Sequence, residues 1–179
     1  MPVNGYGDSK PDEVKMTEVL LGLGSNLGNR QETLEQAWKE IGGLPETQTL
    51  RLSRFYQTEP VGGPPGQPEF LNAVGVIETR LPAQILLEQL QEIELRLGRV
   101  RKEHWGARTL DIDILLYGNQ IIATPTLTVP HPEMLLRRFV LEPAQEVAAG
   151  SVHPETGLTL REHDRIAKQS GKGTSKNRD

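Results

Sequence analysis

The sequence predicts an α+β fold of the ferredoxin-like kind, in which two helices cover one face of an antiparallel sheet. Three observations predict it. Apolar strand-like runs and helical patterns alternate in the order βαββαβ, both helices carry an unbroken apolar stripe, and 179 residues suit one domain. A C-terminal extension of loops and short helices is expected from His131 onward.

The first half of this unit begins with an apolar strand at Glu18–Leu23, which ends at Gly24. Asn29 is the expected cap of the first helix, because Glu32 follows three positions later as in a capping box. The side chains at helical spacing that should face the sheet are Leu34, Ala37, Trp38 and Ile41. A half-buried strand is expected from about Thr49 to Thr58.

The second half begins with an irregular segment. Residues 61–69 read VGGPPGQPE, and three glycines with three prolines exclude a helix or a paired strand there. An apolar strand at Phe70–Thr79 follows, and Pro82 opens a second helix. Its apolar stripe comprises Leu86, Leu90, Ile93 and Leu97. A basic loop at Arg99–Gly106 then leads into a strand at Leu110–Tyr117.

The ends of the chain differ from its middle in composition. Residues 1–16 and 169–179 are polar and aperiodic, so we expect two disordered tails around a single domain at 17–168. Within that domain, a last short strand is expected at Gln120–Ala123.

Composition excludes several classes of protein. Without cysteine, the chain forms no disulfide framework, zinc–cysteine site, iron–sulfur cluster or thiol nucleophile. The formal net charge of −4 argues against nucleic acid as a partner. No apolar stretch is long enough to span a membrane, and the N-terminus lacks the apolar region of a secretory signal. We therefore expect a cytoplasmic protein without nucleic-acid or membrane partners. Separately, we expect it to be a monomer.

Two aspartates share one face of the strand after the basic loop. Side chains alternate along a strand, so Asp111 and Asp113 lie opposite Leu110, Ile112 and Ile114. Adjacent carboxylates repel unless a cation or a basic group lies between them. Mg²⁺ is commonly held by one or two carboxylates together with substrate phosphates, so the pair is a candidate magnesium site.

The neighbouring sequence decides between two interpretations of this pair. A solvated strand face with structural ion pairs is the simpler alternative. However, four basic residues lie just upstream, and arginine forks bind phosphate oxygens as a metal ion does. They are Arg99, Arg101, Lys102 and Arg108. Gln91 and Glu94 lie off the apolar stripe of the preceding helix, where contact with a nucleotide and exposure to solvent both remain open.

Six segments in this order carry a resemblance to a known family. They are Gly24–Gly28 (GSNLG), Phe55–Pro60 (FYQTEP), Gln67–Val74 (QPEFLNAV), Gly98–Arg101 (GRVR), Trp105–Ile114 (WGARTLDIDI) and Val129–Pro132 (VPHP). Together they resemble the 6-hydroxymethyl-7,8-dihydropterin pyrophosphokinases of folate biosynthesis, over roughly residues 18–160. The resemblance implies a reaction in which the pterin hydroxymethyl oxygen attacks the β-phosphorus of ATP and AMP leaves.

The resemblance also implies roles for individual residues. Two Mg²⁺ ions would lie between the ATP phosphates and the aspartates Asp111 and Asp113, which with Arg99 and Arg108 form the implied catalytic set. Further residues implied in ATP binding are Gln91, Glu94, Arg101, Ile114, Thr128, His131 and Arg137. Phe70 and Phe139 would form the walls of the pterin slot, and Asn72 would be its polar anchor. The slot would be completed by Thr58, Val61 and Trp105.

The sequence departs from the family pattern at Glu133, and two functions other than pyrophosphoryl transfer are alternatives. Glu133 lies where some relatives have arginine, so one phosphate contact would be missing. A non-enzymatic module that binds a nucleotide or a metal is the main alternative, although it would not need Phe70, Asn72 and Phe139 to converge. An RNA-binding module is disfavoured because the predicted sheet lacks paired aromatic residues and the net charge is negative.

Overall fold

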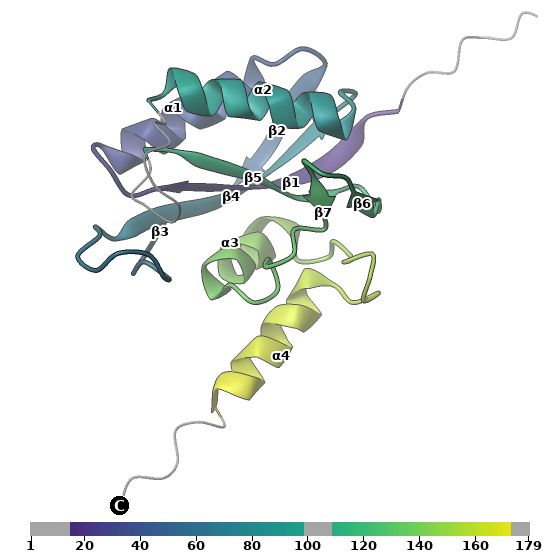
Figure 1. Cartoon of the computed structure of the whole chain (residues 1–179). Helices are drawn as coiled ribbons and strands as arrows, with labels where there is room; N and C mark the ends of the chain where they lie inside the picture. Colours follow the sequence, from purple (N-terminus) through teal and green to yellow (C-terminus); the bar gives the residue numbers. More distant parts are fainter. Residues whose placement is uncertain (1–14, 99–108, 173–179) are drawn as a thin grey trace, which may run out of the picture.

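An antiparallel sheet forms the centre of the molecule in the computed structural model, which describes residues 15–98 and 109–172 (Figure 1). Its main strands lie in the order β2-β4-β1-β5. They are β1 (Thr17–Ser25), β2 (Thr47–Leu52), β4 (Phe70–Thr79) and β5 (Asp111–Tyr117). The short strand β3 (Tyr56–Thr58) continues the line of β2 along β4. Every pairing is antiparallel, so the predicted ferredoxin-like order is confirmed.

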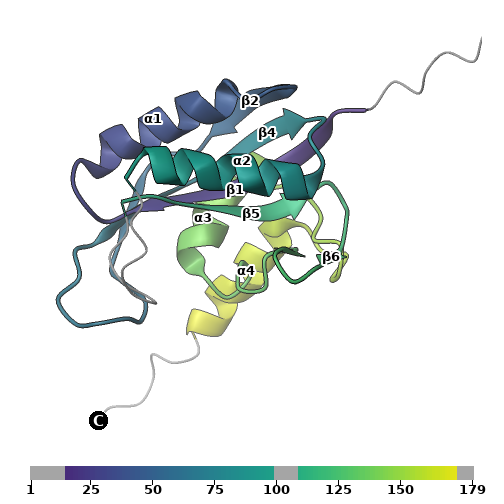
Figure 2. The same cartoon turned by 45° about the horizontal axis from the view of Figure 1, so that its top comes forward.

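Helices lie on both sides of the sheet (Figure 2). The predicted helices α1 (Arg30–Gly42) and α2 (Ala83–Arg96) cover one face. The opposite face is covered by α3 (Arg138–Ala148), against which α4 (Leu160–Lys172) packs on the side away from the sheet. The C-terminal extension therefore supplies a second covering layer that the sequence pattern did not predict.

Two hydrophobic cores separate these layers. The helix-side core lies under α1 and α2, and it contains the predicted stripe residues Leu86, Leu90 and Ile93 with no exposed surface. Trp38 of α1 packs against it, and its ring lies directly over Gly75 of β4, where a Cβ atom would come within 2.2 Å of the ring. The extension-side core joins the other face to α3 and α4. Its members include Val74, Val76, Leu115, Met134, Val140 and Leu160.

The helix ends follow the predicted chemistry. The side chain of Asn29 accepts a hydrogen bond from the backbone N–H of Glu32 at 3.3 Å, which confirms Asn29 as the N-terminal cap. It also donates a bond to the Glu32 carboxylate at 2.8 Å, where a full capping box has the carboxylate accept the backbone N–H of the cap. Pro82 is the N-terminal cap of α2. The apolar stripes and caps thus explain why these two segments are helical and which side of each faces the sheet.

Three boundaries differ from the prediction. The strand expected from Thr49 to Thr58 is divided at Ser53, whose hydroxyl accepts the backbone N–H of Val74 at 3.0 Å and donates to the carbonyl of Arg54 at 2.8 Å. The last predicted strand is shorter, β6 (Ile122–Ala123), and pairs with β7 (Thr128–Val129).

The third difference is at the C-terminus. Residues 169–172, expected to begin a disordered tail, belong to α4, and residues 173–179 lie outside the described part of the chain, as do residues 1–14. Of the helices in the described residues, none has the length and apolar character needed to cross a bilayer.

Candidate active site

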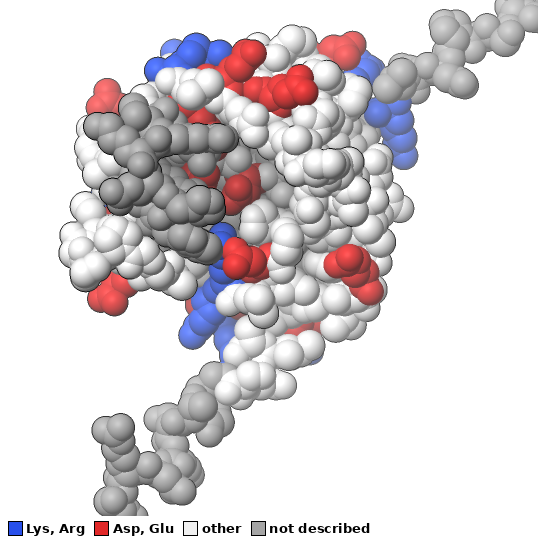
Figure 3. Space-filling view, in the orientation of Figure 1, with Lys and Arg blue, Asp and Glu red and all other residues white. Residues whose placement is uncertain are grey.

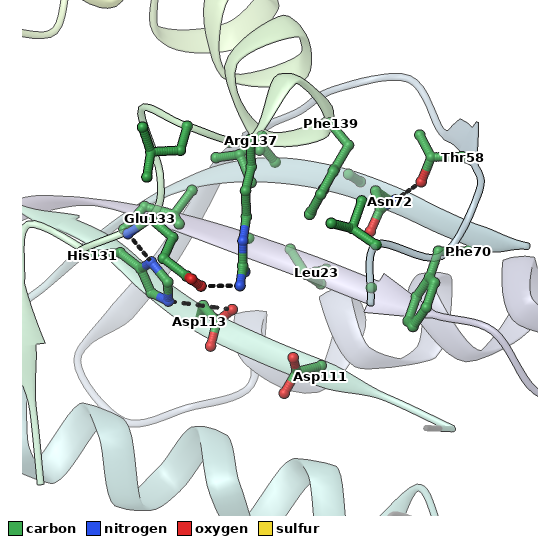
Figure 4. Close-up of a pocket in the computed structure, with 18 of the residues that line it drawn as sticks. Leu23, Thr58, Phe70, Asn72, Asp111, Asp113, His131, Glu133, Arg137 and Phe139 are labelled. Carbon is green, nitrogen blue, oxygen red and sulfur yellow. Dashed lines mark hydrogen bonds and ion pairs between the residues drawn. The ribbon is translucent and has the colours of Figure 1, made fainter. Parts of the chain in front are cut away.

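The floor of the site is formed by three neighbouring strands on the α3 face of the sheet. Asn72 of β4, Gly24 of β1 and Asp111 of β5 lie side by side, and Gly22 and Asp113 are paired in the next row. Both central positions are glycines, so no side chain rises from the middle strand between the polar groups on either side. This pair of glycines leaves room for a ligand directly above the sheet (Figure 4).

A cavity of about 470 Å³ opens above this floor. It brings together all of the predicted pterin-slot residues that the structure describes. They are Thr58, Val61, Phe70, Asn72 and Phe139, contributed by β3, β4, α3 and the segment after β3. Figure 4 shows the two phenylalanine rings on different walls, with the Asn72 side chain between them. The side chain of Asn72 donates a hydrogen bond to the Thr58 hydroxyl at 2.7 Å, which fixes the orientation of its amide.

A second cavity, of about 380 Å³, lies on the other side of the aspartates. Four residues predicted to contact the nucleotide line it, namely Gln91, Glu94, Ile114 and Thr128. Both cavities share Asp111, Asp113 and His131. Ligands in the two cavities would therefore meet beside these three residues.

Glu94 has a structural role that its sequence position did not reveal. Its residue surface is only 3% exposed, which excludes the interpretation that it faces solvent. The carboxylate accepts the backbone N–H of Ile112 at 2.7 Å, between the two aspartates of β5. Among the described strands β5 lies at the edge of the sheet, so this bond fixes it from the side opposite β1.

His131 lies above the aspartates, with its Nε2 at 3.8 Å from the carboxylate of Asp113. Its Nδ1 accepts the backbone N–H of Glu133 at 3.2 Å, so the proton of the neutral ring is on Nε2 and points toward the site. Burial and the charge of Arg137 lower the pKa of His131 below its ordinary value, although Glu133 and Asp111 act in the opposite direction. The ring is therefore neutral near pH 7, and its Nε2–H faces the Asp113 carboxylate.

Arg137 is the arginine that lines the larger cavity among the described residues, and it has contacts on two sides. Its guanidinium forms an ion pair with Glu133 and lies 5.6 Å from the centre of the Phe139 ring. In the space-filling view, acidic side chains lie inside a hollow on this face, with basic ones beside them (Figure 3). This juxtaposition of both signs is what a site for a metal ion and a polyphosphate requires.

The donor set fits magnesium better than a soft metal. Asp111 and Asp113 are two carboxylates on one strand face, and Mg²⁺ takes one or two carboxylates and completes its shell with waters and phosphates. Within residues 15–98 and 109–172, no group of three or more histidine, aspartate or glutamate side chains is arranged to hold a metal ion. The two aspartates would therefore hold the ion together with the phosphates rather than alone.

Some predicted site residues lie outside the described part of the chain, and some residues that line the larger cavity had no assigned role. Arg99, Arg101, Trp105 and Arg108 lie outside the described residues. Gly22, Gly24 and Glu133 line the larger cavity but were not assigned a binding role from the sequence. The glycines had a visible signal, since two glycines at alternate positions in an apolar strand leave one face of that strand bare. Glu133 had the four-residue spacing to Arg137 that is typical of a helical ion pair.

The fold and the site define an α+β enzyme with two adjoining cavities that meet at a pair of carboxylates. A family model described as "7,8-dihydro-6-hydroxymethylpterin-pyrophosphokinase (HPPK)" matches residues 20–149, and the chain belongs to this family. It is therefore a pyrophosphokinase of folate biosynthesis, which transfers a pyrophosphoryl group from ATP to hydroxymethyldihydropterin. This assignment excludes the alternative of a non-enzymatic binding module.

Individual relatives agree with the family. The chain is 47% identical over 143 residues to a 2-amino-4-hydroxy-6-hydroxymethyldihydropteridine pyrophosphokinase of Haemophilus influenzae, covering 80% of this chain and 89% of that protein. It is 45% identical over 130 residues to the protein of the same name from Pseudomonas aeruginosa, covering 73% of this chain and 80% of the other. A crystal structure of Plasmodium falciparum HPPK-DHPS with pteroate superposes with a TM-score of 0.72 over 89% of this chain. This chain spans 44% of that longer one at 13% identity, so the similarity shows the fold alone.

Proposed function

We propose that the reaction of this enzyme depends on Mg²⁺ held by Asp111 and Asp113, and that it produces pterin diphosphate and AMP. The observation that carries the proposal is the meeting of the two cavities at Asp111, Asp113 and His131. A flat heterocycle in one cavity and a nucleotide in the other would bring their reacting ends together over the two carboxylates.

The larger cavity suits the pterin. The rings of Phe70 and Phe139 offer apolar faces to a flat bicyclic ring, and the amide of Asn72 supplies both a donor and an acceptor for its polar edge. Because the Thr58 hydroxyl already orients this amide, it is preorganised for the ligand. Thr58 and Val61 close the outer side of the cavity.

The smaller cavity suits the nucleotide. Gln91 and Thr128 supply polar groups, and Ile114 and Leu127 supply apolar surface for a base and ribose. His131 and Arg137 then lie where phosphates would pass from this cavity toward the aspartates. The family resemblance implies Arg99, Arg101 and Arg108 as further phosphate-binding residues.

Catalysis in this arrangement is mainly positioning and charge neutralisation. The pterin hydroxymethyl oxygen forms a bond to the β-phosphorus and releases its proton to water. The bond from that phosphorus to the oxygen shared with the α-phosphate breaks, and AMP leaves with the electron pair. The Nε2–H of His131 is oriented to stabilise negative charge on a phosphate oxygen. Two bound Mg²⁺ ions would withdraw charge from the β-phosphate and lower the pKa of the attacking hydroxyl.

A direct assay tests the proposal. The protein is incubated with ATP, 6-hydroxymethyl-7,8-dihydropterin and either MgCl₂ or EDTA, and the nucleotide products are separated. We expect AMP in the presence of Mg²⁺ and none in EDTA, whereas ADP would contradict pyrophosphoryl transfer. Asp111→Ala and Asp113→Ala should each lower turnover about a hundredfold or more. Glu18→Ala, which removes an exposed acid of β1, is the matched control and should leave turnover unchanged.

A further inference from the structure

We propose that, in the free enzyme, the carboxylate of Glu133 occupies the N–H edge of Arg137 where a phosphate would bind. It thereby sets the affinity of the enzyme for polyphosphate. This inference rests on the proposed function, since it takes Arg137 as a phosphate-binding residue. Glu133 lines the same cavity as Arg137 and forms an ion pair with it. Figure 4 shows the guanidinium end of Arg137 meeting this carboxylate close to the strand that carries Asp113.

The chemistry of the two partners explains the competition. A guanidinium binds carboxylate and phosphate through the same planar fork of N–H donors. Arg137 is also held on its flat side, 5.6 Å from the centre of the Phe139 ring, so its N–H edge is the part that remains for an anion. A phosphate that approaches this edge meets the negative charge of Glu133, and the two anions repel at close range.

The surroundings allow Glu133 to leave when a ligand arrives. The side chain of Glu133 is 46% exposed and that of Arg137 is 26% exposed, so the ion pair is weak enough to be exchanged. The backbone N–H of Glu133 donates to His131 Nδ1, and the Glu133 carbonyl accepts the N–H of Leu136 at 3.0 Å. Rotation of the carboxylate into solvent breaks neither bond, so His131 keeps its tautomer during the exchange.

The first turn of α3, just after this segment, supplies a matched control. Glu142 forms an ion pair with Arg138 at the same four-residue spacing, and neither residue lines the cavities. Glu133→Gln and Glu142→Gln therefore each remove one charge and break one i,i+4 pair, but only the first pair lies in the site. Glutamine retains the length and the planar end of the glutamate side chain, and the backbone N–H of residue 133 can still donate to His131.

The test measures binding by calorimetry on the full chain, without pterin. ATP is titrated in the presence of Mg²⁺, and tripolyphosphate is titrated in EDTA. We expect Glu133→Gln to bind both ligands about two- to tenfold more tightly than the wild type, and Glu142→Gln to bind as the wild type does. In the Arg137→Ala background, the additional Glu133→Gln change should give no gain, because its effect passes through Arg137.

Four results would overturn the inference. They are unchanged or weaker binding of tripolyphosphate by Glu133→Gln, an equal gain in Glu142→Gln, a gain that persists without Arg137, and weaker binding of ATP only when Mg²⁺ is present. The last result would assign Glu133 to the metal instead. If the wild type binds neither ATP nor tripolyphosphate, the proposed function fails together with this inference. If the wild type binds both ligands and the variants bind them equally well, the role of Glu133 is rejected but the proposed function is not.

Discussion

The carboxylate of Glu94 accepts the backbone N–H of Ile112 at 2.7 Å, and Ile112 separates the two aspartates of the site. A side chain of α2 thus fixes the edge strand at the one position that orients both Asp111 and Asp113. Losing a buried hydrogen bond is costly, because the donor or acceptor left behind cannot bond to water instead. We therefore expect Glu94 to act on the proposed reaction through the position of the two aspartates.

The first prediction concerns this bond. Glu94→Ala should lower kcat about tenfold or more and raise the Mg²⁺ concentration that gives half-maximal turnover, because β5 loses its lateral support. Glu94→Gln retains an acceptor oxygen and should recover most of both values. Glu92→Ala is the control on the exposed side of α2. A normal Mg²⁺ requirement in Glu94→Ala would contradict the positioning role.

The second prediction compares the two glycines of the floor. A Cβ atom at Gly24 would lie 2.9 Å from the amide oxygen of Asn72, whereas one at Gly22 would make ordinary 3.5 Å contacts with Leu115. Gly24→Ala should therefore displace the Asn72 amide and weaken pterin binding about tenfold or more. Gly22→Ala should have a smaller effect. Calorimetry with the pterin substrate measures both, and equal losses would show that the contact with Asn72 is not the cause.

The third prediction concerns the packing of Trp38 on Gly75. A Cβ atom at Gly75 would lie 2.2 Å from the indole ring, so Gly75→Ala should lower the free energy of unfolding by about 1–3 kcal/mol. Gly150→Ala is the control, since no heavy atom lies within 4 Å of a Cβ there. Urea unfolding followed by circular dichroism compares the two variants. A loss at Gly75 no larger than at Gly150 would mean that the ring moves aside without cost.

The fourth prediction concerns pH and a histidine outside the site. His153 is 3% exposed, and within the described residues its Nδ1 has no hydrogen-bond partner. Burial and the neighbouring His163 lower its pKa below the ordinary value of about 6.5. The unfolded chain therefore takes up a proton at a higher pH than the folded protein does. This contribution to stability is present above about pH 6.5 and is lost as the pH falls toward the lowered pKa.

Unfolding free energies between pH 8 and pH 5 test this sign. The wild type should lose stability over that range, and His153→Gln should show a shallower dependence. His131, whose pKa is also lowered, acts in the same direction and accounts for part of the remaining slope. Glu146 has a lowered carboxyl pKa, so it contributes at lower pH, below about 4.5. Equal slopes for the two proteins would contradict the assignment to His153.

The placement of the two aspartates could be predicted from sequence because strand alternation is a local rule. Ile112 lies in the helix-side core while Asp111 and Asp113 line the cavities, as the period of two requires. The pterin-slot residues could be predicted only through the family resemblance. Nothing in their spacing shows that Phe139, on a helix of the extension, meets Phe70 at the start of β4.

Other features depend on how elements pack and could not be predicted from local patterns. Glu94 lies off the apolar stripe of α2, and only the contact between α2 and β5 decides that its carboxylate is buried. The division of the expected strand at Ser53 results from a hydroxyl that replaces a backbone partner for Val74. The spacing of Glu133 and Arg137 indicates a pair, but the position of α3 places that pair inside the cavity.

The molecule is built as a series of layers, with α1 and α2 first, then the sheet, then α3, and α4 outermost (Figure 1). Outer layers open more readily than a sheet that is buried from both sides. Amide hydrogens of α4 should therefore exchange first, those of α3 next, and those of β1 last. Phe139 belongs to α3, so one wall of the cavity would detach when α3 opens. On gentle heating, the enzyme should accordingly lose its pterin affinity while the sheet and its two inner helices are still folded.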